Sequence, residues 1–140
     1  MTSSPTIHAT AVLVGATALL IRGEPGSGKS RLALRLIHTL PFARLVGDDR
    51  VHLEASHGRL LVRPAGSLSG MIEIRGIGIR KLPYEAVATV GRVLDLVIAA
   101  DRLPEPDGQK AIISGITLPR IALPAGGDPL PAVLAALVGN

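Results

Sequence analysis

The sequence predicts an α/β fold with a mixed sheet, built around a phosphate-binding loop (P-loop). The first observation is the stretch Gly23-Glu24-Pro25-Gly26-Ser27-Gly28-Lys29-Ser30, which fits the pattern G-x-x-x-x-G-K-[ST]. The second is its context, because residues 17–22 form an apolar run of strand length and apolar side chains at helical spacing follow the loop. The third is length: we expect residues 1–140 to form a single domain.

The residues of the loop at 23–30 are of types that bind an anion. Successive backbone N–H groups between a strand and a helix can surround a phosphate, and the helix N-terminus adds positive potential. We expect Gly23, Gly26 and Gly28 to adopt positive φ and to let phosphate approach the backbone. Lys29, expected to be an exposed loop residue, would reach the β- and γ-phosphates of a nucleotide, and the Ser30 hydroxyl would hold Mg²⁺.

The segments around the loop are predicted from their apolar runs. Residues 7–14 read as one strand, and Gly15-Ala16 turns the chain into the next strand over 17–22. So short a connection makes the two strands antiparallel neighbours. A helix follows over about 29–40, and Pro41 marks its end.

The remaining elements are expected to be shorter. The predictions are a strand over 44–46, a hairpin of 51–54 and 60–63, a loop over 64–70, a short helix or turn within 82–91, a buried strand over 93–98, a loop over 101–108, strands at 112–113 and 116–123, a loop over 124–129 and a helix over 131–138.

The composition limits the function classes. Aromatic residues make up 1% of the chain, which argues against nucleic-acid binding by base stacking. There is no cysteine, which excludes disulfides and thiolate zinc sites. We see no signal peptide and no apolar stretch of membrane-spanning length, so a cytoplasmic location is expected. The net charge of +4 is mostly arginine spread along the chain, and it fits either a solvated basic surface or attraction to phosphates or an acidic partner.

Two adjacent acids follow the strand after the helix. Asp48 and Asp49 lie where an acid close to Mg²⁺ would sit in a P-loop protein. In an extended backbone the two carboxylates point in different directions, so one could face the metal while the other accepts a proton from a hydroxyl. The alternative is an Asp-Asp turn or a helix cap.

Further candidates come from residues 71–79 and from the N-terminus. Glu73 and Arg75 share one face of an expected strand, which fits either a surface ion pair or a functional pair. Gly76 and Gly78 suggest that the backbone there bends close to something. His8, alone, is more often a plain surface or core histidine.

Together these motifs resemble the catalytic domain of HPr kinase/phosphorylase. The resemblance rests on His8, the loop at 23–30, the Asp48-Asp49-Arg50-Val51 segment and the Glu73-Ile74-Arg75-Gly76-Ile77-Gly78-Ile79 segment, and it spans roughly residues 7–81. The E-I-R-G-I-G-I segment is not a general feature of P-loop proteins. The resemblance implies a P-loop fold like that of phosphoenolpyruvate carboxykinase.

The resemblance also implies an activity. Members phosphorylate a serine of HPr, a carrier protein of bacterial phosphotransferase systems, and can remove that phosphate by phosphorolysis. By resemblance the loop residues 23–30 bind ATP, Lys29 stabilises the transferred group, and one of the two aspartates is the proton acceptor. His8, Lys29, Asp48, Asp49 and Arg75 form the expected catalytic set. Ser30, Asp49 and Glu73 form the expected Mg²⁺ set. An HPr-like partner and a homo-oligomer, hexameric in the family, are expected, with no nucleic acid or membrane partner.

The chain departs from the family pattern in three places. The family's N-terminal domain is expected to be absent, Arg31 replaces an acid that often follows G-K-S, and residues 119–128 lack the R-P-G-R-N-type segment, with Arg120 preceding its place. Two other functions therefore stay open at this point. One is a sensor or interaction module that binds ATP without transferring phosphate. The other is a small-molecule kinase.

Overall fold

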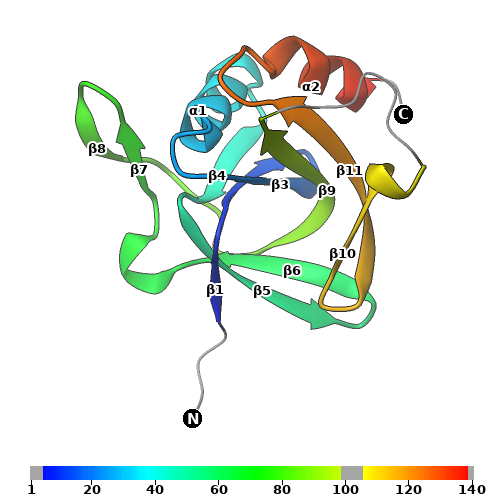
Figure 1. Ribbon diagram of the computed structural model, residues 1–140. Coiled ribbons are helices and arrows are strands. Elements are labelled where there is room, and N and C mark those ends of the chain that lie inside the picture. Colours follow the sequence, from blue (N-terminus) through cyan, green and yellow to red (C-terminus); the bar gives the residue numbers. More distant parts are fainter. Residues whose placement is uncertain (1–4, 99–105, 139–140) are drawn as a thin grey trace.

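The computed structural model describes residues 5–98 and 106–138 (Figure 1). The elements, in chain order, are β1 (Thr6–His8), β2 (Thr10–Val14), β3 (Thr17–Gly23), α1 (Lys29–Thr39), β4 (Ala43–Gly47), β5 (Arg50–Ser56), β6 (Arg59–Pro64), the 3₁₀ turn η1 (Gly66–Leu68), β7 (Met71–Ile74), β8 (Gly78–Lys81), β9 (Ala88–Val97), the 3₁₀ turn η2 (Pro106–Gln109), β10 (Lys110–Ile113), β11 (Ile116–Pro124) and α2 (Leu130–Val138). The loop expected over 101–108 lies mostly outside the described residues.

The main sheet is mixed, as the sequence predicted. Its strands run in the order β1-β5-β6-β9-β3-β2-β4, and β11 also pairs with β9 while β10 pairs with β11. Strand β9 is parallel to β3 and to β11, whereas β2 lies antiparallel to β3 and β4. The parallel strands β3 and β9 therefore bring the start of the loop at 23–30 next to the end of β9.

Two aliphatic cores lie on the two sides of the central strands. Successive residues of β3 face the two cores in turn. Leu19 and Ile21 belong to the core under α1 and α2, and Ala18 and Leu20 belong to the core enclosed by β5, β6 and β11. Both helices lie over the same side of the sheet (Figure 1). Burial of α1 through Leu32, Ala33 and Leu36 therefore anchors the helix that begins at the loop. No helix in the described part of the chain is long and apolar enough to cross a membrane.

The first strand differs from its prediction. Residues 7–14 form two strands with different partners, because β1 pairs with β5 while β2 pairs with β3 and β4. At the break, the N–H of Ala9 donates to the carbonyl of Asp49 at 3.2 Å. The interruption places residues 48–50 against the corner between β1 and β2.

Two later segments also differ. Residues 71–81 form the hairpin β7–β8, which projects from the body (Figure 1), so Glu73 and Arg75 do not share one face of a continuous strand. Gly76 and Gly78 adopt φ of 80° and 114°, so the backbone does bend there, but a Cβ at either position would meet nothing within 4 Å, and the expected close approach is wrong. The helix or turn expected within 82–91 is wrong, because residues 82–87 hold only an isolated bridge at Tyr84 and a bend, and β9 begins at Ala88.

Candidate active site

The loop at 23–30 turns tightly from β3 into α1. Gly26 and Gly28 have φ of 83° and 105°, which L-residues with a side chain rarely adopt. Gly28 is the N-cap of α1, and no side chain caps the helix there. Gly23 is not in the positive-φ region, which corrects our expectation; it is required by space, since a Cβ would lie 2.4 Å from the Ser27 hydroxyl oxygen and 3.1 Å from the Leu96 carbonyl oxygen.

Lys29 is buried rather than exposed. Only 8% of its surface is accessible. Its Nζ donates to the carbonyl of Gly23 at 2.8 Å and to that of Glu24 at 3.2 Å. The lysine therefore closes the loop on itself, and the expectation that it is an exposed loop residue is wrong.

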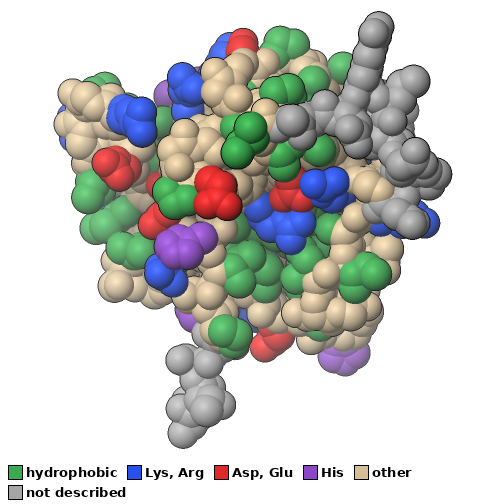
Figure 2. Space-filling view, in the orientation of Figure 1, with side chains coloured by type: hydrophobic (Ala, Val, Ile, Leu, Met, Phe, Trp, Pro, Cys, Tyr) green, Lys and Arg blue, Asp and Glu red, His purple; other side chains and the backbone are tan. Residues whose placement is uncertain are grey.

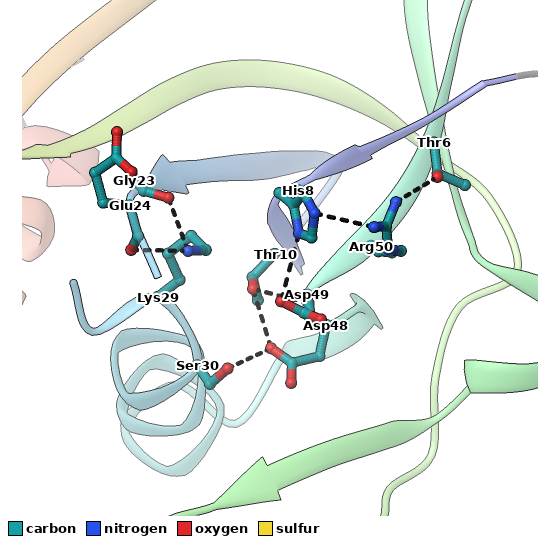
Figure 3. Close-up of polar contacts among 10 residues, drawn as sticks. All are labelled: Thr6, His8, Thr10, Gly23, Glu24, Lys29, Ser30, Asp48, Asp49 and Arg50. Atoms are coloured by element: carbon teal, nitrogen blue, oxygen red, sulfur yellow. Dashed lines mark hydrogen bonds and ion pairs between the residues drawn. The ribbon is translucent and has the colours of Figure 1, made fainter. Parts of the chain in front are cut away.

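Asp48 is a buried carboxylate held by two hydroxyls (Figure 3). It is 7% exposed. Its Oδ1 accepts hydrogen bonds from Ser30 Oγ at 2.6 Å and from Thr10 Oγ1 at 3.0 Å. Among the described residues, no arginine, lysine or histidine forms an ion pair with it. Asp48 is thus a buried acid without a protein cation, in contact with the last residue of the loop.

The Asp49 side chain points away from Asp48. Its φ is 68°, and the Arg50 N–H donates to the Asp48 carbonyl at 2.8 Å, which closes a three-residue turn. The two carboxylates diverge because of this turn rather than because of an extended backbone. The Asp49 side chain is 67% exposed, so it is open to an incoming group.

His8 lies between Asp49 and Arg50 (Figure 3). Its Nε2 is 3.0 Å from Arg50 NH2, and its Nδ1 is 3.8 Å from Asp49 Oδ1. Because arginine can only donate, Nε2 accepts and the proton of a neutral imidazole is on Nδ1, facing Asp49. The distance of 3.8 Å exceeds that of a hydrogen bond.

A cavity of about 450 Å³ joins the loop to the β7–β8 hairpin. It is lined by Pro25, Gly26, Gly28, Lys29, Ser30, Arg31, Leu34, Asp49, Glu73, Ile74 and Arg75. Of the sequence-predicted residues, it therefore brings together most of the loop with Asp49, Glu73 and Arg75. Asp48 lies just behind it, with its Oδ2 3.5 Å from the Glu73 N–H. Across residues 5–98 and 106–138, no three His, Asp or Glu side chains cluster as a metal site on their own.

Sequence reasoning missed Thr10, which contacts both aspartates. Its hydroxyl donates to Asp48, as above, and accepts from the Asp49 N–H at 3.3 Å. The sequence carried a signal, because Thr10 is a polar residue in the apolar run that follows His8. In the structure Thr10 is completely buried.

A second buried acid was also missed. Asp95 of β9 accepts from Arg22 Nε and NH2 at 2.7 and 2.8 Å, and Arg120 of β11 pairs with it from the other side. Burial by itself raises the pKa of Asp95, but the hydrogen bonds and charges of the two arginines outweigh it and hold the pKa below its ordinary value. Figure 2 shows basic and acidic side chains side by side over β3 and β9.

Comparison with protein families gives a direct match. The model described as the HPr Serine kinase C-terminal domain matches residues 1–86. Curated relatives include an HPr kinase/phosphorylase of Clostridium tetani, 39% identical over 90 residues that make up 64% of this chain and 28% of the relative. Another is that of Mycoplasma mycoides, 43% identical over 79 residues, or 54% of this chain and 24% of the relative. The matches thus span about a quarter of these relatives.

A solved structure matches nearly the whole chain. The HPr(Ser) kinase/phosphatase of Coxiella burnetii aligns with a TM-score of 0.80 and 31% identity, over 98% of this chain and 90% of the other. The likeness therefore extends to α2, well beyond the residues matched by the family model.

Proposed function

This chain belongs to the HPr serine kinase C-terminal domain family, and from that premise we propose that it is an ATP-dependent protein-serine kinase. Its substrate would be an HPr-like phosphocarrier protein of a bacterial phosphotransferase system, and its place of action the cytoplasm. The observation that carries the proposal is the contact of Ser30 with the buried Asp48, at the edge of a cavity of about 450 Å³. The further likeness to phosphoenolpyruvate carboxykinase and the hexameric assembly belong to the same proposal.

The loop would hold the nucleotide phosphates. Gly26 and Gly28 expose backbone N–H groups at the N-terminus of α1, where the helix potential favours an anion. Lys29 now donates to the carbonyls of Gly23 and Glu24. To reach a phosphate, its ammonium group would exchange these partners for phosphate oxygens. Since the carbonyls are neutral and the phosphates are charged, this exchange favours the bound state.

The residues around Ser30 suit Mg²⁺. This ion prefers oxygen ligands, and in nucleotide sites it is held by one or two side chains together with phosphates. Ser30 donates its proton to Asp48, so the lone pairs of its oxygen are free for a cation. We place Asp48 on the metal side with Ser30 and Glu73, and thus depart from the expectation that put Asp49 there. When bound, Mg²⁺ would neutralise charge on the β- and γ-phosphate oxygens.

Asp49 would then be the proton acceptor. It lines the cavity, it is exposed, and it faces away from Asp48. As the serine oxygen forms its bond to the γ-phosphorus and the bond to ADP breaks, Asp49 would take the hydroxyl proton. In phosphorolysis it would return that proton to the serine. The Nδ1–H of His8 faces Asp49 and would orient its carboxylate on moving closer than the present 3.8 Å.

Arg75 would complete the site from the hairpin. It lines the same cavity from the turn after β7, opposite the loop, and it is exposed. A guanidinium in this position can contact a transferring phosphoryl group or an acidic edge of the partner. Among the described strands, β7 and β8 pair only with each other. Ile72, which is 1% exposed, anchors the hairpin in the core under α1, and the Glu73 N–H contacts Asp48.

The test is a transfer assay. The purified chain is incubated with ATP, Mg²⁺ and the HPr-like protein encoded by the same organism, and intact and digested proteins are analysed by mass spectrometry. We expect one phosphate on one serine, absent with Lys29→Ala even though a thermal melt shows that this variant is folded. ATP binding without transfer would instead support a sensor module. Adding excess inorganic phosphate then tests the reverse reaction.

A further inference from the structure

Thr10 occupies a place where a hydroxyl is unfavourable unless it is bonded. It begins β2, it is 0% exposed, and its neighbours Ala9 and Ala11 are also completely buried. An unsatisfied hydroxyl in such an environment destabilises a fold by about 1–3 kcal/mol. Its two hydrogen bonds, to the two adjacent aspartates, are therefore required for its presence in the core.

The direction of each proton around Thr10 follows from the donors. The Asp49 N–H can only donate, so the Thr10 oxygen accepts it and the Thr10 proton goes to Asp48 Oδ1. Ser30 also donates to that same Oδ1. Two hydroxyls thus fix one carboxylate oxygen of Asp48 and leave Oδ2 directed toward the hairpin, where its contact with the Glu73 N–H is 3.5 Å long.

The same side chain supports the strained turn at Asp49. A three-residue turn with positive φ at its centre is rare and unfavourable by about 1–3 kcal/mol, so the surroundings must hold it. Here the Asp49 N–H is held by Thr10, and the Asp49 carbonyl by the Ala9 N–H. Both contacts come from the corner where β1 ends and β2 begins.

We propose that Thr10 is the positioning residue that couples the two aspartates, aiming the Asp48 carboxylate at the metal side of Ser30 while holding the turn that presents Asp49 to the substrate. This inference rests on the proposed function for its kinetic consequence. Thr10 is not among the residues that line the cavity. It acts only through Asp48 and Asp49.

Two pairs of variants isolate the hydroxyl. Thr10 and Thr10→Val differ by the hydroxyl at equal volume, and Thr10→Ser and Thr10→Ala differ by the same group on a smaller side chain. Loss of a group that orients a metal-side ligand typically lowers activity or metal affinity about 10–100-fold. We expect kcat to fall by about that factor in Thr10→Val and Thr10→Ala and by less than about threefold in Thr10→Ser. The KM for the protein substrate and the Kd for metal-free ATP should change little. Thr89→Val, on a partly buried threonine of β9, is the matched control.

A second readout is independent of catalysis. The affinity for Mn²⁺, used as a spin probe for Mg²⁺ in the presence of a non-hydrolysable ATP analogue, is measured by electron paramagnetic resonance. We expect it to fall in Thr10→Val and Thr10→Ala and to be kept in Thr10→Ser and Thr89→Val. If the wild type transfers no phosphate, the proposed function fails, and the Mn²⁺ series still tests Thr10.

Three results would overturn the inference. Thr10→Val with wild-type kcat and Mn²⁺ affinity would show that the hydroxyl is dispensable. A folded Thr10→Ser as impaired as Thr10→Ala would make the role one of packing. If Thr10→Val and Thr10→Ala lose as much affinity for metal-free ATP as for Mn²⁺, the loop as a whole is distorted. Should Thr10→Val fail to fold, the serine and alanine pair gives the same decision.

Discussion

Asp48 and Asp95, the two buried aspartates in the described part of the chain, are in opposite electrostatic situations. Asp48 and Asp95 are 7% and 8% exposed, and each follows or belongs to a strand of the main sheet. Asp95 lies between Arg22 and Arg120. Asp48 is held by the hydroxyls of Ser30 and Thr10 and forms no ion pair within the described part of the chain.

From this difference we infer that Asp95 is a structural acid and that Asp48 is a functional one. A buried ion pair ties strands together, and its geometry is complete without any ligand. A buried carboxylate that accepts only from neutral donors, here two hydroxyls and the long contact from the Glu73 N–H, is instead left with unneutralised charge. Such a group destabilises the free protein and becomes favourable when a cation arrives. We therefore expect changes at Asp95 to affect folding and changes at Asp48 to affect function.

The largest expected effect is that of Asp48→Asn on transfer. Asparagine keeps the shape but is neutral and has one oxygen instead of two, so the metal side of Ser30 loses its anionic partner. We expect kcat to fall about 100-fold or more. The free energy of unfolding, measured by urea denaturation, should stay equal or increase, because a buried unpaired charge is removed. A folded Asp48→Asn with near-normal kcat would contradict the assignment.

The second effect is that of Asp95→Asn on stability. Removing the acid leaves two arginines facing each other, which in fully buried pairs destabilises by about 3–5 kcal/mol. Since the Arg22 and Arg120 side chains are 34% and 22% exposed, water offsets part of this, and we expect about 2 kcal/mol in urea denaturation. At temperatures where the variant is folded, transfer should persist. An unchanged unfolding midpoint would show that the cluster is not structural.

The third effect is the pH dependence of the stability difference between wild type and Asp95→Asn. The pKa of Asp95 is lowered below its ordinary value of 3.8, because its arginines outweigh the effect of burial. The folded state then binds fewer protons than the unfolded chain as the carboxyl titrates, so stability rises with pH there. The stability gap between wild type and Asp95→Asn should be full above about pH 4 and shrink as the pH falls through the folded pKa. A gap independent of pH down to acid unfolding would refute this.

The smallest effect is that of Glu54→Gln. Glu54 pairs with Arg63 across β5 and β6, but both side chains are about half exposed. Exposed pairs contribute about 0–1 kcal/mol, and salt screens them. We expect the unfolding free energy to change by less than about 0.5 kcal/mol. A change as large as that of Asp95→Asn would mean that burial is not what distinguishes the pairs.

Local patterns predicted the parts of the fold that depend on neighbours in sequence. The helix after the loop, the hairpin of β5 and β6 and the terminal helix were predicted because their apolar spacing and turn residues are local signals. The features that the sequence did not predict depend on contacts between residues far apart in the chain. The break at Ala9 exists because Asp49, far along the chain, bonds to it, and Gly91 lies inside β9 because Thr17 leaves no room for a side chain there.

The sequence named the candidate site residues, whose roles stay predictions. It named the loop by its motif, Asp48 and Asp49 by their place after the next strand, and Glu73 by the family resemblance. It left open the roles of Asp48 and Asp49, because only the turn with φ of 68° shows which carboxylate is buried against Ser30. The burial of Lys29 was mispredicted, because its partners are backbone carbonyls of its own loop. No sequence motif includes Thr10, and its proposed role depends on contacts with Asp48 and Asp49, which lie 38 and 39 residues away.

The most direct test of the contrast between the two acids is a metal-binding measurement. Mn²⁺ is titrated in the presence of a non-hydrolysable ATP analogue, and the bound ion is followed by electron paramagnetic resonance in wild type, Asp48→Asn and Asp95→Asn. We predict that Asp48→Asn weakens Mn²⁺ binding by about tenfold or more and that Asp95→Asn leaves it unchanged. Equal Mn²⁺ affinity in wild type and a folded Asp48→Asn would contradict the claim that Asp48 keeps its charge for a cation.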